Sequence, residues 1–254
     1  TLTANASTGF AGTSAELRKV SNEVVSGTIL TTGTDLVTVV EGAGTTILAA
    51  DVVHLDANLA TGDFSDDGEV NLLDASIVGI QGSLADLNTI NTAANPADGN
   101  RSIDLNGKTH ANTITDTGIL SSSTIMGIRN SIGQQGNSTV VANAASGFTG
   151  LLASLKTLQA TVKAGKGAAA KNVLTTGNDK VVVEDTGTVS ADDLLQVDDT
   201  LASNNFGNSG HVDATAISGI TGDIAKVKLV SDAVTGGNAA TITISANIDV
   251  TTTG

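Results

Sequence analysis

The chain has 254 residues with 40% hydrophobic side chains, and it contains four Phe but no Tyr, Trp or Cys. This composition predicts an aliphatic core and excludes disulfides, thiolate metal sites and thiol redox catalysis. The 12 basic and 26 acidic residues give a formal net charge of −14, which disfavours nucleic acid and anionic membranes as partners, and no apolar run reaches the ~20 residues of a membrane span.

One phrase recurs four times along the chain, at Gly9–Leu17, Gly79–Leu87, Gly147–Leu155 and Gly219–Val227. Each copy reads Gly-apolar-x-Gly-x-x-Ala-x-apolar, and the copies start 70, 68 and 72 residues apart. A frame kept at this spacing predicts a tandem repeat, in which one supersecondary unit of about 70 residues stacks on copies of itself. Such arrays usually build surfaces and assemblies rather than a single catalytic cleft.

In chain order, each phrase is expected to open a helix. Thr13 with Glu16, and Ser83 with Asp86, have the spacing of a capping box, in which each side chain satisfies a backbone amide at the helix start. Apolar stripes at helical spacing continue two of these helices. The stripes are Leu84, Leu87 and Ile90 in one helix, and Leu152, Leu155, Leu158 and Val162 in the other.

A strand is predicted next, because Leu30–Glu41 and Leu174–Glu184 both pass from a Gly-Asx turn into β-branched residues. The strands are expected at Leu36–Val40 and Val181–Val183, and the residues 102–118 hold a degenerate middle copy. A helix is predicted after each strand. These helices cover Ile47–Leu59, Ile119–Ile132 and Val189–Leu201, the last opening with a Ser190/Asp193 capping box.

A polar turn then leads to a short strand that ends at the repeated glycine, as in Val212–Gly219. The unit therefore reads strand–helix–strand–helix, which favours parallel pairing and predicts an α/β, solenoid-like array. The expected boundaries are residues 1–27 for the second half of a unit, 28–99 for a unit, 100–171 for a degenerate unit, 172–236 for a unit, and 237–254 for the terminal strand of a following unit. Because the array begins and ends inside a unit, we expect the chain to be part of a larger protein.

The terminal segment Ala240–Val250 alternates apolar and polar residues, which predicts one strand. Its apolar face consists of Ile242, Ile244, Ala246, Ile248 and Val250. A strand with one apolar face and no following helix has incomplete pairing. It is expected to dock either on a neighbouring subunit or on the rest of a longer chain.

A candidate calcium loop lies between Asp63 and Asp74, where oxygen-bearing residues follow the spacing of an EF-hand loop. Gly68 occupies the turn position, and Asp at the last position is closer to the dockerin type of loop. The predicted ligands are Asp63, Ser65, Asp67, Glu69 through its backbone carbonyl, Asn71 and Asp74. The alternative is an acidic surface turn, because the corresponding turns of the other units are mostly uncharged.

No other constellation in the sequence indicates catalysis. The three histidines lie far apart, and the chain has no P-loop, dinucleotide fingerprint or Ser/His/Asp arrangement. The phrase glycines recur without a phosphate-binding Lys, which indicates a structural role. The sequence therefore predicts a protein that is not an enzyme.

The phrases LTTGTDLVTVVEG, VSADDLLQVDDTLAS, VDATAISGITGDIAKV and DASIVGIQGSLADL resemble the Ala/Thr/Gly/Asp-rich tandem repeats of large secreted surface proteins of cyanobacteria and marine bacteria. That group includes S-layer-like and haemolysin-type calcium-binding proteins. The resemblance implies an extracellular or cell-surface location, calcium as a cofactor of assembly, and a structural or adhesive role. The Gly-Gly-x-Gly-x-Asp nonapeptide of many such proteins is missing here.

The sequence thus predicts an extracellular structural protein, a subunit of a fibre, sheath or surface layer that forms a homopolymer through its repeat faces and terminal strand. The alternative is an adhesin or binding module within a giant surface protein, with a cell-surface glycan as a possible partner. The scarcity of aromatic residues disfavours stacking against sugars.

Overall fold

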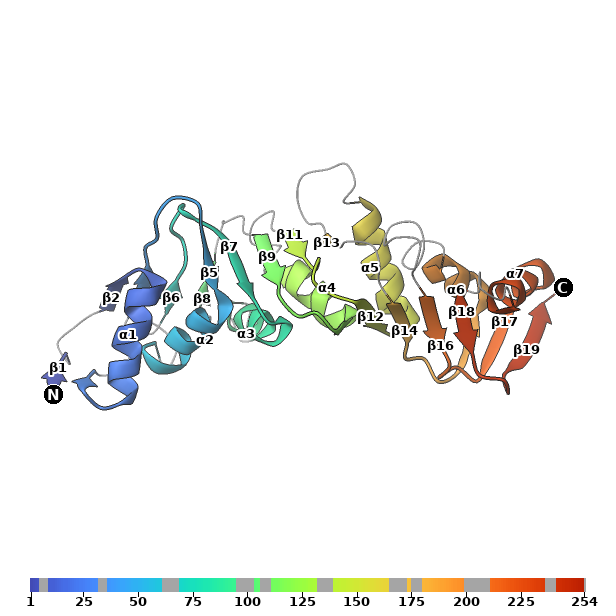
Figure 1. The fold of residues 1–254 in the computed structure, drawn as a ribbon, viewed down its shortest axis with the longest axis horizontal. Helices are drawn as coiled ribbons and strands as arrows, with labels where there is room; N and C mark the ends of the chain where they lie inside the picture. The colour runs from blue at the N-terminus through green and yellow to red at the C-terminus, as the bar shows by residue number, and fades with distance from the viewer. Residues whose placement is uncertain are drawn as a thin grey trace. The chain divides into compact units, whose positions relative to one another are not determined.

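A computed structural model describes residues 1–4, 9–31, 36–60, 69–94, 103–105, 111–131, 139–164, 173–174, 180–198, 211–235 and 241–253. The chain divides into two compact units. Unit 1 holds Thr1–Thr115 and Gly127–Val141, and unit 2 holds Asp116–Met126 and Ala142–Gly254. Within each unit, helices alternate with short parallel strands (Figure 1). The predicted α/β class is therefore confirmed.

Unit 1 contains parallel strands that pair in the orders β1-β3, β2-β4-β6-β8 and β5-β7-β9-β11. Its elements are β1 (Leu2–Thr3), β2 (Gly9–Gly12), α1 (Ser14–Val25), β3 (Ile29–Leu30), β4 (Leu36–Val39), β5 (Thr45–Leu48), α2 (Ala49–Asn58), β6 (Val70–Asn71), β7 (Ile77–Gly82), α3 (Leu84–Ala94), β8 (Ile103–Asp104), β9 (Ala111–Ile114) and β11 (Thr139–Val141). The chain changes unit after Thr115, after Met126 within α4 (Ser122–Ser131), and after Val141.

Unit 2 contains parallel strands in the orders β10-β12-β14-β16-β18 and β15-β17-β19. Its elements are β10 (Ile119–Ser121), β12 (Gly147–Gly150), α5 (Leu152–Ala164), β13 (Val173–Leu174), β14 (Lys180–Val183), β15 (Thr188–Ser190), α6 (Ala191–Val197), β16 (His211–Ala214), β17 (Gly219–Asp223), α7 (Ile224–Thr235), β18 (Ile242–Ile244) and β19 (Asp249–Thr253). Each described strand pairs with the strand two places away in the sequence, so every connection is a crossover, as parallel pairing requires.

The four phrases occupy matching places in this arrangement. They form β2, the end of β7, β12 and β17, and each strand runs directly into a helix: α1, α3, α5 and α7. On one side each of these strands pairs with a strand that begins at Leu36, Ala111, Lys180 or Asp249. Ile80, Phe148 and Ile220, the second residues of three phrases, are buried, whereas Phe10 in β2 is half-buried.

The phrase glycines other than Gly12 are required because a Cβ there would lie within 3.0 Å of another atom. A Cβ on Gly147 would come within 2.2 Å of the Lys180 carbonyl oxygen, and a Cβ on Gly9 within 2.4 Å of the Leu36 carbonyl oxygen. In three phrases the second glycine (Gly82, Gly150 and Gly222) faces the first residue of the preceding helix. A Cβ on Gly82 would lie 2.6 Å from the Cβ of Ala49. The phrase thus marks the places where strands and helices approach most closely.

Three helix starts were predicted to carry a capping box, and the structure shows different hydrogen bonds at each. Thr13 caps α1 in a complete capping box, in which its side chain accepts from the Glu16 amide while the Glu16 carboxylate accepts from the Thr13 amide. This prediction is confirmed. Ser190 precedes α6 as predicted but makes no side-chain capping hydrogen bond, so its capping box is wrong. At Ser83, the hydroxyl accepts from the Asp86 amide at 3.0 Å and donates to the Asp86 carboxylate.

The helix α2 starts later than predicted. The predicted helix Ile47–Leu59 begins only at Ala49, because Ile47 and Leu48 belong to β5 and pair with β7. Val52, Leu55 and Leu59 of the predicted stripe are buried, but Leu48 is exposed. The same correction applies at 119–121 and 188–190, where β10 and β15 precede their helices. Pairing with a distant strand overrides the local helical spacing there.

The predicted single strand over Ala240–Val250 is also wrong. The segment forms two strands, β18 and β19, separated by residues 245–248. β18 pairs with β16 and β19 pairs with β17, so the two strands belong to different sheets. The apolar alternation continues across the break and therefore does not reveal it.

Candidate functional site

The predicted calcium ligands divide between described and undescribed parts of the chain. Asp63, Ser65 and Asp67 lie outside the described residues. Glu69 directly precedes β6, Asn71 is its last residue, and Asp74 follows it. The Glu69 carbonyl accepts a hydrogen bond from the Val37 amide at 2.8 Å. The Asn71 side-chain oxygen accepts from the Leu73 amide at 3.0 Å.

Asp74 has a structural role in the described geometry. One carboxylate oxygen accepts from the Ser76 amide at 2.9 Å, and the other accepts from the Glu41 amide at 2.8 Å. The side chain therefore joins the loop after β6 to the end of β4. Within the described residues no three His, Asp or Glu side chains converge as a metal site, and calcium binding at the loop 63–74 stays a prediction.

Carboxylates also hold two helix starts in the described structure. The Glu41 carboxylate accepts from the Ser14 amide at the first residue of α1, at 2.7 Å. The Asp185 carboxylate accepts from the Leu152 amide at the first residue of α5, also at 2.7 Å. A negative charge is favourable at a helix N-terminus. Some of the excess acidic residues are thus part of the scaffold.

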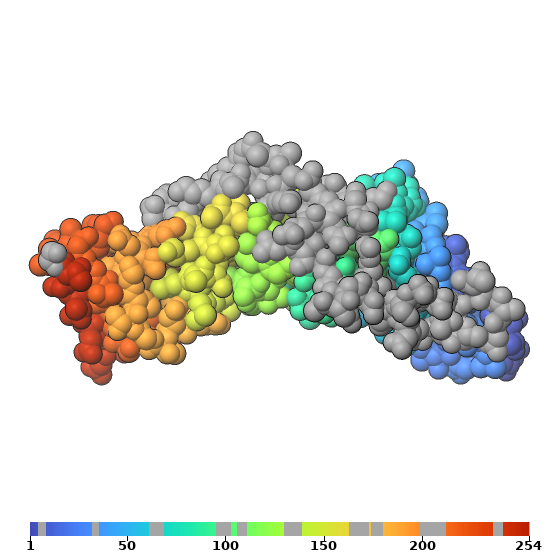
Figure 2. Space-filling model, turned by 180° about the vertical axis from the view of Figure 1, so that it is seen from behind, coloured from blue at the N-terminus to red at the C-terminus, as the bar shows by residue number. Residues whose placement is uncertain are grey.

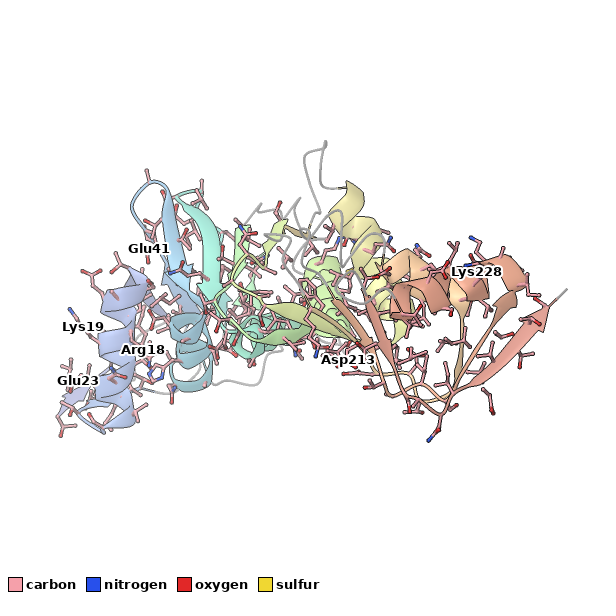
Figure 3. The ribbon with its side chains drawn as sticks, turned by 45° about the vertical axis from the view of Figure 1, so that its right-hand side comes forward. Arg18, Lys19, Glu23, Glu41, Asp213 and Lys228 are labelled. Carbon is pink, nitrogen blue, oxygen red and sulfur yellow. The ribbon has the colours of Figure 1, made fainter. Side chains whose placement is uncertain are left out.

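Basic side chains connect consecutive helices. Arg18, the fifth residue of α1, donates to Asp51 of α2 at 3.0 Å and lies between these helices (Figure 3). Lys156, the fifth residue of α5, pairs in the same way with Asp193 of α6. Asp51 and Asp193 are each the third residue of their helix. The side of α1 and α5 that carries the fifth residue therefore faces the next helix.

The same side of α7 has no helix against it in the described structure. Lys228, the fifth residue of α7, pairs with Asp232 of its own helix at 2.7 Å, and 72% of its side chain is exposed (Figure 3). The eighth residue of the helix shows the same contrast. Ser21, Asn91 and Gln159 are buried at this position in α1, α3 and α5, whereas Ser231 of α7 is exposed.

An apolar groove of about 360 Å³ lies beside this side of α7. Its lining comes from α7, from β17 and from the segment 244–250, which includes the start of β19. The apolar lining residues include Ile220, Val227, Val230, Ile244, Ile248 and Val250. We call this surface the α7–β19 face. It consists of the groove, the strand β19, and the side of α7 that carries Val227, Lys228 and Ser231.

The strand β19 completes the α7–β19 face. It pairs with β17 along one edge, and among the described strands none pairs with its other edge. All residues of β19 are exposed, and Figure 2 shows the C-terminal residues, in red, at the surface of unit 2. An apolar groove next to an open strand edge is a surface suited to binding another polypeptide.

A cross-strand ion pair predicts the pH dependence of unit 2. Lys180 of β14 donates to Asp213 of β16 (labelled in Figure 3) at 3.0 Å. This bond, together with those from Thr215, lowers the pKa of Asp213. The ionised form therefore stabilises the fold above the unfolded pKa of about 3.9, and this contribution disappears as the pH falls through the lower folded pKa.

We expect Asp213→Asn to reduce the free energy of unfolding at pH 7 by less than about 1 kcal/mol, as for other surface ion pairs. Thermal melts followed by circular dichroism between pH 2 and 7 would check this expectation. The difference between wild type and variant should shrink below pH ~4. A difference that stays constant over this range would assign the effect to hydrogen bonding alone, and Lys180→Met should reproduce the profile if the ion pair is its cause.

The sequence singled out the incomplete pairing of the terminal segment Ala240–Val250 but not the side of α7 that lies next to it. The available signal was the basic residue at the fifth position of three phrase helices, together with the Asp at the third position of Ala49–Asn58 and Ala191–Val197.

No helix in the described part of the chain is long and apolar enough to cross a membrane. No protein-family model, curated protein or solved structure matches the chain.

Proposed function

We propose that this protein is an extracellular structural protein that assembles end to end into a fibre, sheath or surface layer. In this proposal the chain is a solenoid-like array, and the strand–helix unit of about 70 residues is its building block. The observation that supports the proposal is the equivalent place of the four phrases in the order of strands and helices.

The matching places of the four phrases support the array. The strand after each phrase strand in the sheet order begins at Leu36, Ala111, Lys180 or Asp249, and successive starts are separated by 75, 69 and 69 residues. In an array of this type each unit covers the apolar side of its neighbour, and in this proposal copies of the protein stack through the same repeat faces. The resemblance of the phrases to those of secreted surface proteins supports the location, and calcium remains part of the proposal as a possible cofactor.

We expect the purified protein to form filaments or sheets as its concentration rises. Negative-stain microscopy and light scattering would be run with calcium and with a chelator, because the two conditions separate assembly from its dependence on metal. Assembly in both conditions would support a structural role that does not need calcium. Assembly only with calcium would support the structural role and calcium as its cofactor. A stable monomer in both conditions, at concentrations up to the millimolar range, would overturn the structural role. Specific binding to glycans by that monomer would instead favour the adhesin alternative.

A further inference from the structure

We infer that His54 makes the contact between α1 and α2 sensitive to acid, because its imidazole packs there in the neutral form and a second ring proton loosens α1 from α2. The inference concerns a switch inside unit 1 and is independent of the proposed assembly. It follows from the hydrogen bonds of the imidazole, from the charged side chains that face it, and from the equivalent contact between α5 and α6, where a glutamine stands in place of the histidine.

The hydrogen bonds of Asn58 fix which ring nitrogen of His54 carries the proton. The Asn58 side-chain amide nitrogen donates to the His54 carbonyl oxygen at 2.8 Å and lies 3.3 Å from the His54 Nδ1. A carbonyl oxygen only accepts, so the Asn58 atom beside it is the nitrogen and not the amide oxygen. The second hydrogen of this nitrogen points to Nδ1, which is therefore the acceptor. The imidazole is thus neutral and carries its proton on Nε2.

A second proton on His54 has no favourable place in this arrangement. It would go to Nδ1, where it would meet the hydrogen of the Asn58 amide, so that hydrogen bond would be lost. On the other side of the ring, Nε2 is buried and has no hydrogen-bond partner among the described residues. A cation without acceptors for its N–H groups is unfavourable away from water. The charged form of His54 therefore favours conformations in which the ring reaches water.

The charged groups that face His54 do not offset this cost. Arg18 of α1 disfavours a positive charge on the ring, and Asp51 of α2 favours one. The Asp51 carboxylate, however, already accepts from the Arg18 guanidinium at 3.0 Å. Burial of the ring and then the charge of Arg18 lower the pKa of His54, and Asp51 opposes this shift only in part.

The other charged residues of the elements packed closely on α2 are directed elsewhere. On α1, Lys19 and Glu23 point away from α2 (Figure 3), and Glu16 is held in its own capping box. On α2 itself, Asp56 lies two residues from His54 and so does not share its side of the helix. The single charged residue of α3, Asp86, is bonded at the start of its own helix. The strands β5, β6 and β7 contain no charged residue.

The contact between α5 and α6 is the equivalent one in unit 2. Its ion pair between Lys156 and Asp193 corresponds to the ion pair that joins α1 and α2. His54 is the sixth residue of α2, and the sixth residue of α6 is Gln196. Gln159 of α5 donates to the Gln196 carbonyl oxygen at 3.2 Å, so this position lies at the helix contact there as well. A glutamine does not titrate, and the contact in unit 2 is therefore an internal control.

A first test compares the wild type with His54→Gln, which introduces the residue found in α6. Because the folded pKa of His54 is lowered, the stability that its neutral form contributes is complete above the unfolded pKa of about 6.5. This contribution is lost as the pH falls from there toward the folded pKa. Hydrogen exchange followed by mass spectrometry at pH 7.5 and pH 5, corrected for intrinsic rates, would measure the opening of α1 and α2.

On acidification, we expect the opening of α1 and α2 to rise several-fold more in the wild type than in His54→Gln. Exchange in α5 and α6 should be the same in the two proteins at each pH. Comparing the two proteins at one pH cancels the titration of other groups, His110 and His211 included. An equal rise in α1 and α2 of both proteins would overturn the inference.

A second test reads the imidazole directly in the wild type. Nuclear magnetic resonance after histidine-selective ¹⁵N labelling distinguishes the two neutral tautomers. The signals that disappear in His110→Gln and in His211→Gln identify the remaining one as His54. We expect the Nε2–H tautomer at pH 7.5 and a titration midpoint below about 6.5. The Nδ1–H tautomer, or a midpoint at or above that value, would contradict the switch.

The variant Asn58→Asp is expected to act in the opposite direction. Its carboxylate would accept from a protonated Nδ1, so the midpoint of His54 should rise above that of the wild type. The additional opening of α1 and α2 at pH 5 should then disappear. If the midpoint stays in place and exchange increases equally at both pH values, Asn58 has only a packing role and the inference is wrong.

Discussion

Replacing Gly147 with alanine is expected to lower the free energy of unfolding of unit 2 by about 3 kcal/mol. The physical reason is steric: the new Cβ would lie 2.2 Å from the Lys180 carbonyl oxygen and 2.9 Å from its carbon. Both are backbone atoms of β14, so the clash is not relieved by a side-chain rotation. The neighbouring strands β12 and β14 must separate or shift their register.

Denaturant unfolding followed by circular dichroism would measure this change, because the chain has no Trp or Tyr to report by fluorescence. The matched control is Gly187→Ala, also in unit 2, where a Cβ would meet no atom within 4 Å. We expect the control to change the free energy of unfolding by less than about 1 kcal/mol in either direction. Equal effects at the two glycines would contradict the close strand approach at Gly147.

Replacing Phe148 with alanine is expected to cost about 3–5 kcal/mol, the range for truncating a buried aromatic side chain. Phe148 is fully buried and is among the largest fully buried side chains of the described core. It lies between Leu120 of β10 and Val181 of β14, which are its partners in the sheet. Truncation leaves a cavity in a core that is otherwise aliphatic.

The comparison for this prediction is Phe10→Ala in unit 1. Phe10 has the same place in its phrase but is only half-buried, because β2 pairs with β4 on one edge and with no described strand on the other. We expect its replacement to cost clearly less, about 1–2 kcal/mol. A cost at Phe10 equal to that at Phe148 would show that β2 is covered by another polypeptide in solution.

The sequence was informative wherever a residue type had one physical reason to recur. The α/β class, the strand at Leu36–Val39, the capping box at Thr13 and the buried stripe from Leu152 to Val162 were predicted from local pattern. The glycines Gly9 and Gly147 recur because a neighbouring backbone leaves no room for a Cβ. A steric requirement of this kind can be recognised in the sequence as a glycine that recurs at the same position.

Features that depend on distant partners were missed. Ile47 and Leu48 continue a helical spacing, yet they form a strand because β7 lies beside them. The apolar alternation from Ile242 to Val250 hides a break, because the two halves pair with different strands. The incomplete pairing of the terminal segment was predicted, but the side of α7 next to it was not, because local pattern does not show which helices pack against one another.

Strand pairing over short stretches of chain has a consequence for how the protein is made. Phe148 pairs with Val181, and Val181 pairs with Val212, so the partner of each strand was synthesised only some thirty residues earlier. Within each unit, the described strands pair with strands that are close to them in the sequence. Such local closure keeps contact order low and permits ordering in step with emergence from a ribosome or an export channel. A chain threaded unfolded through a narrow pore would then gain structure from its leading end onward.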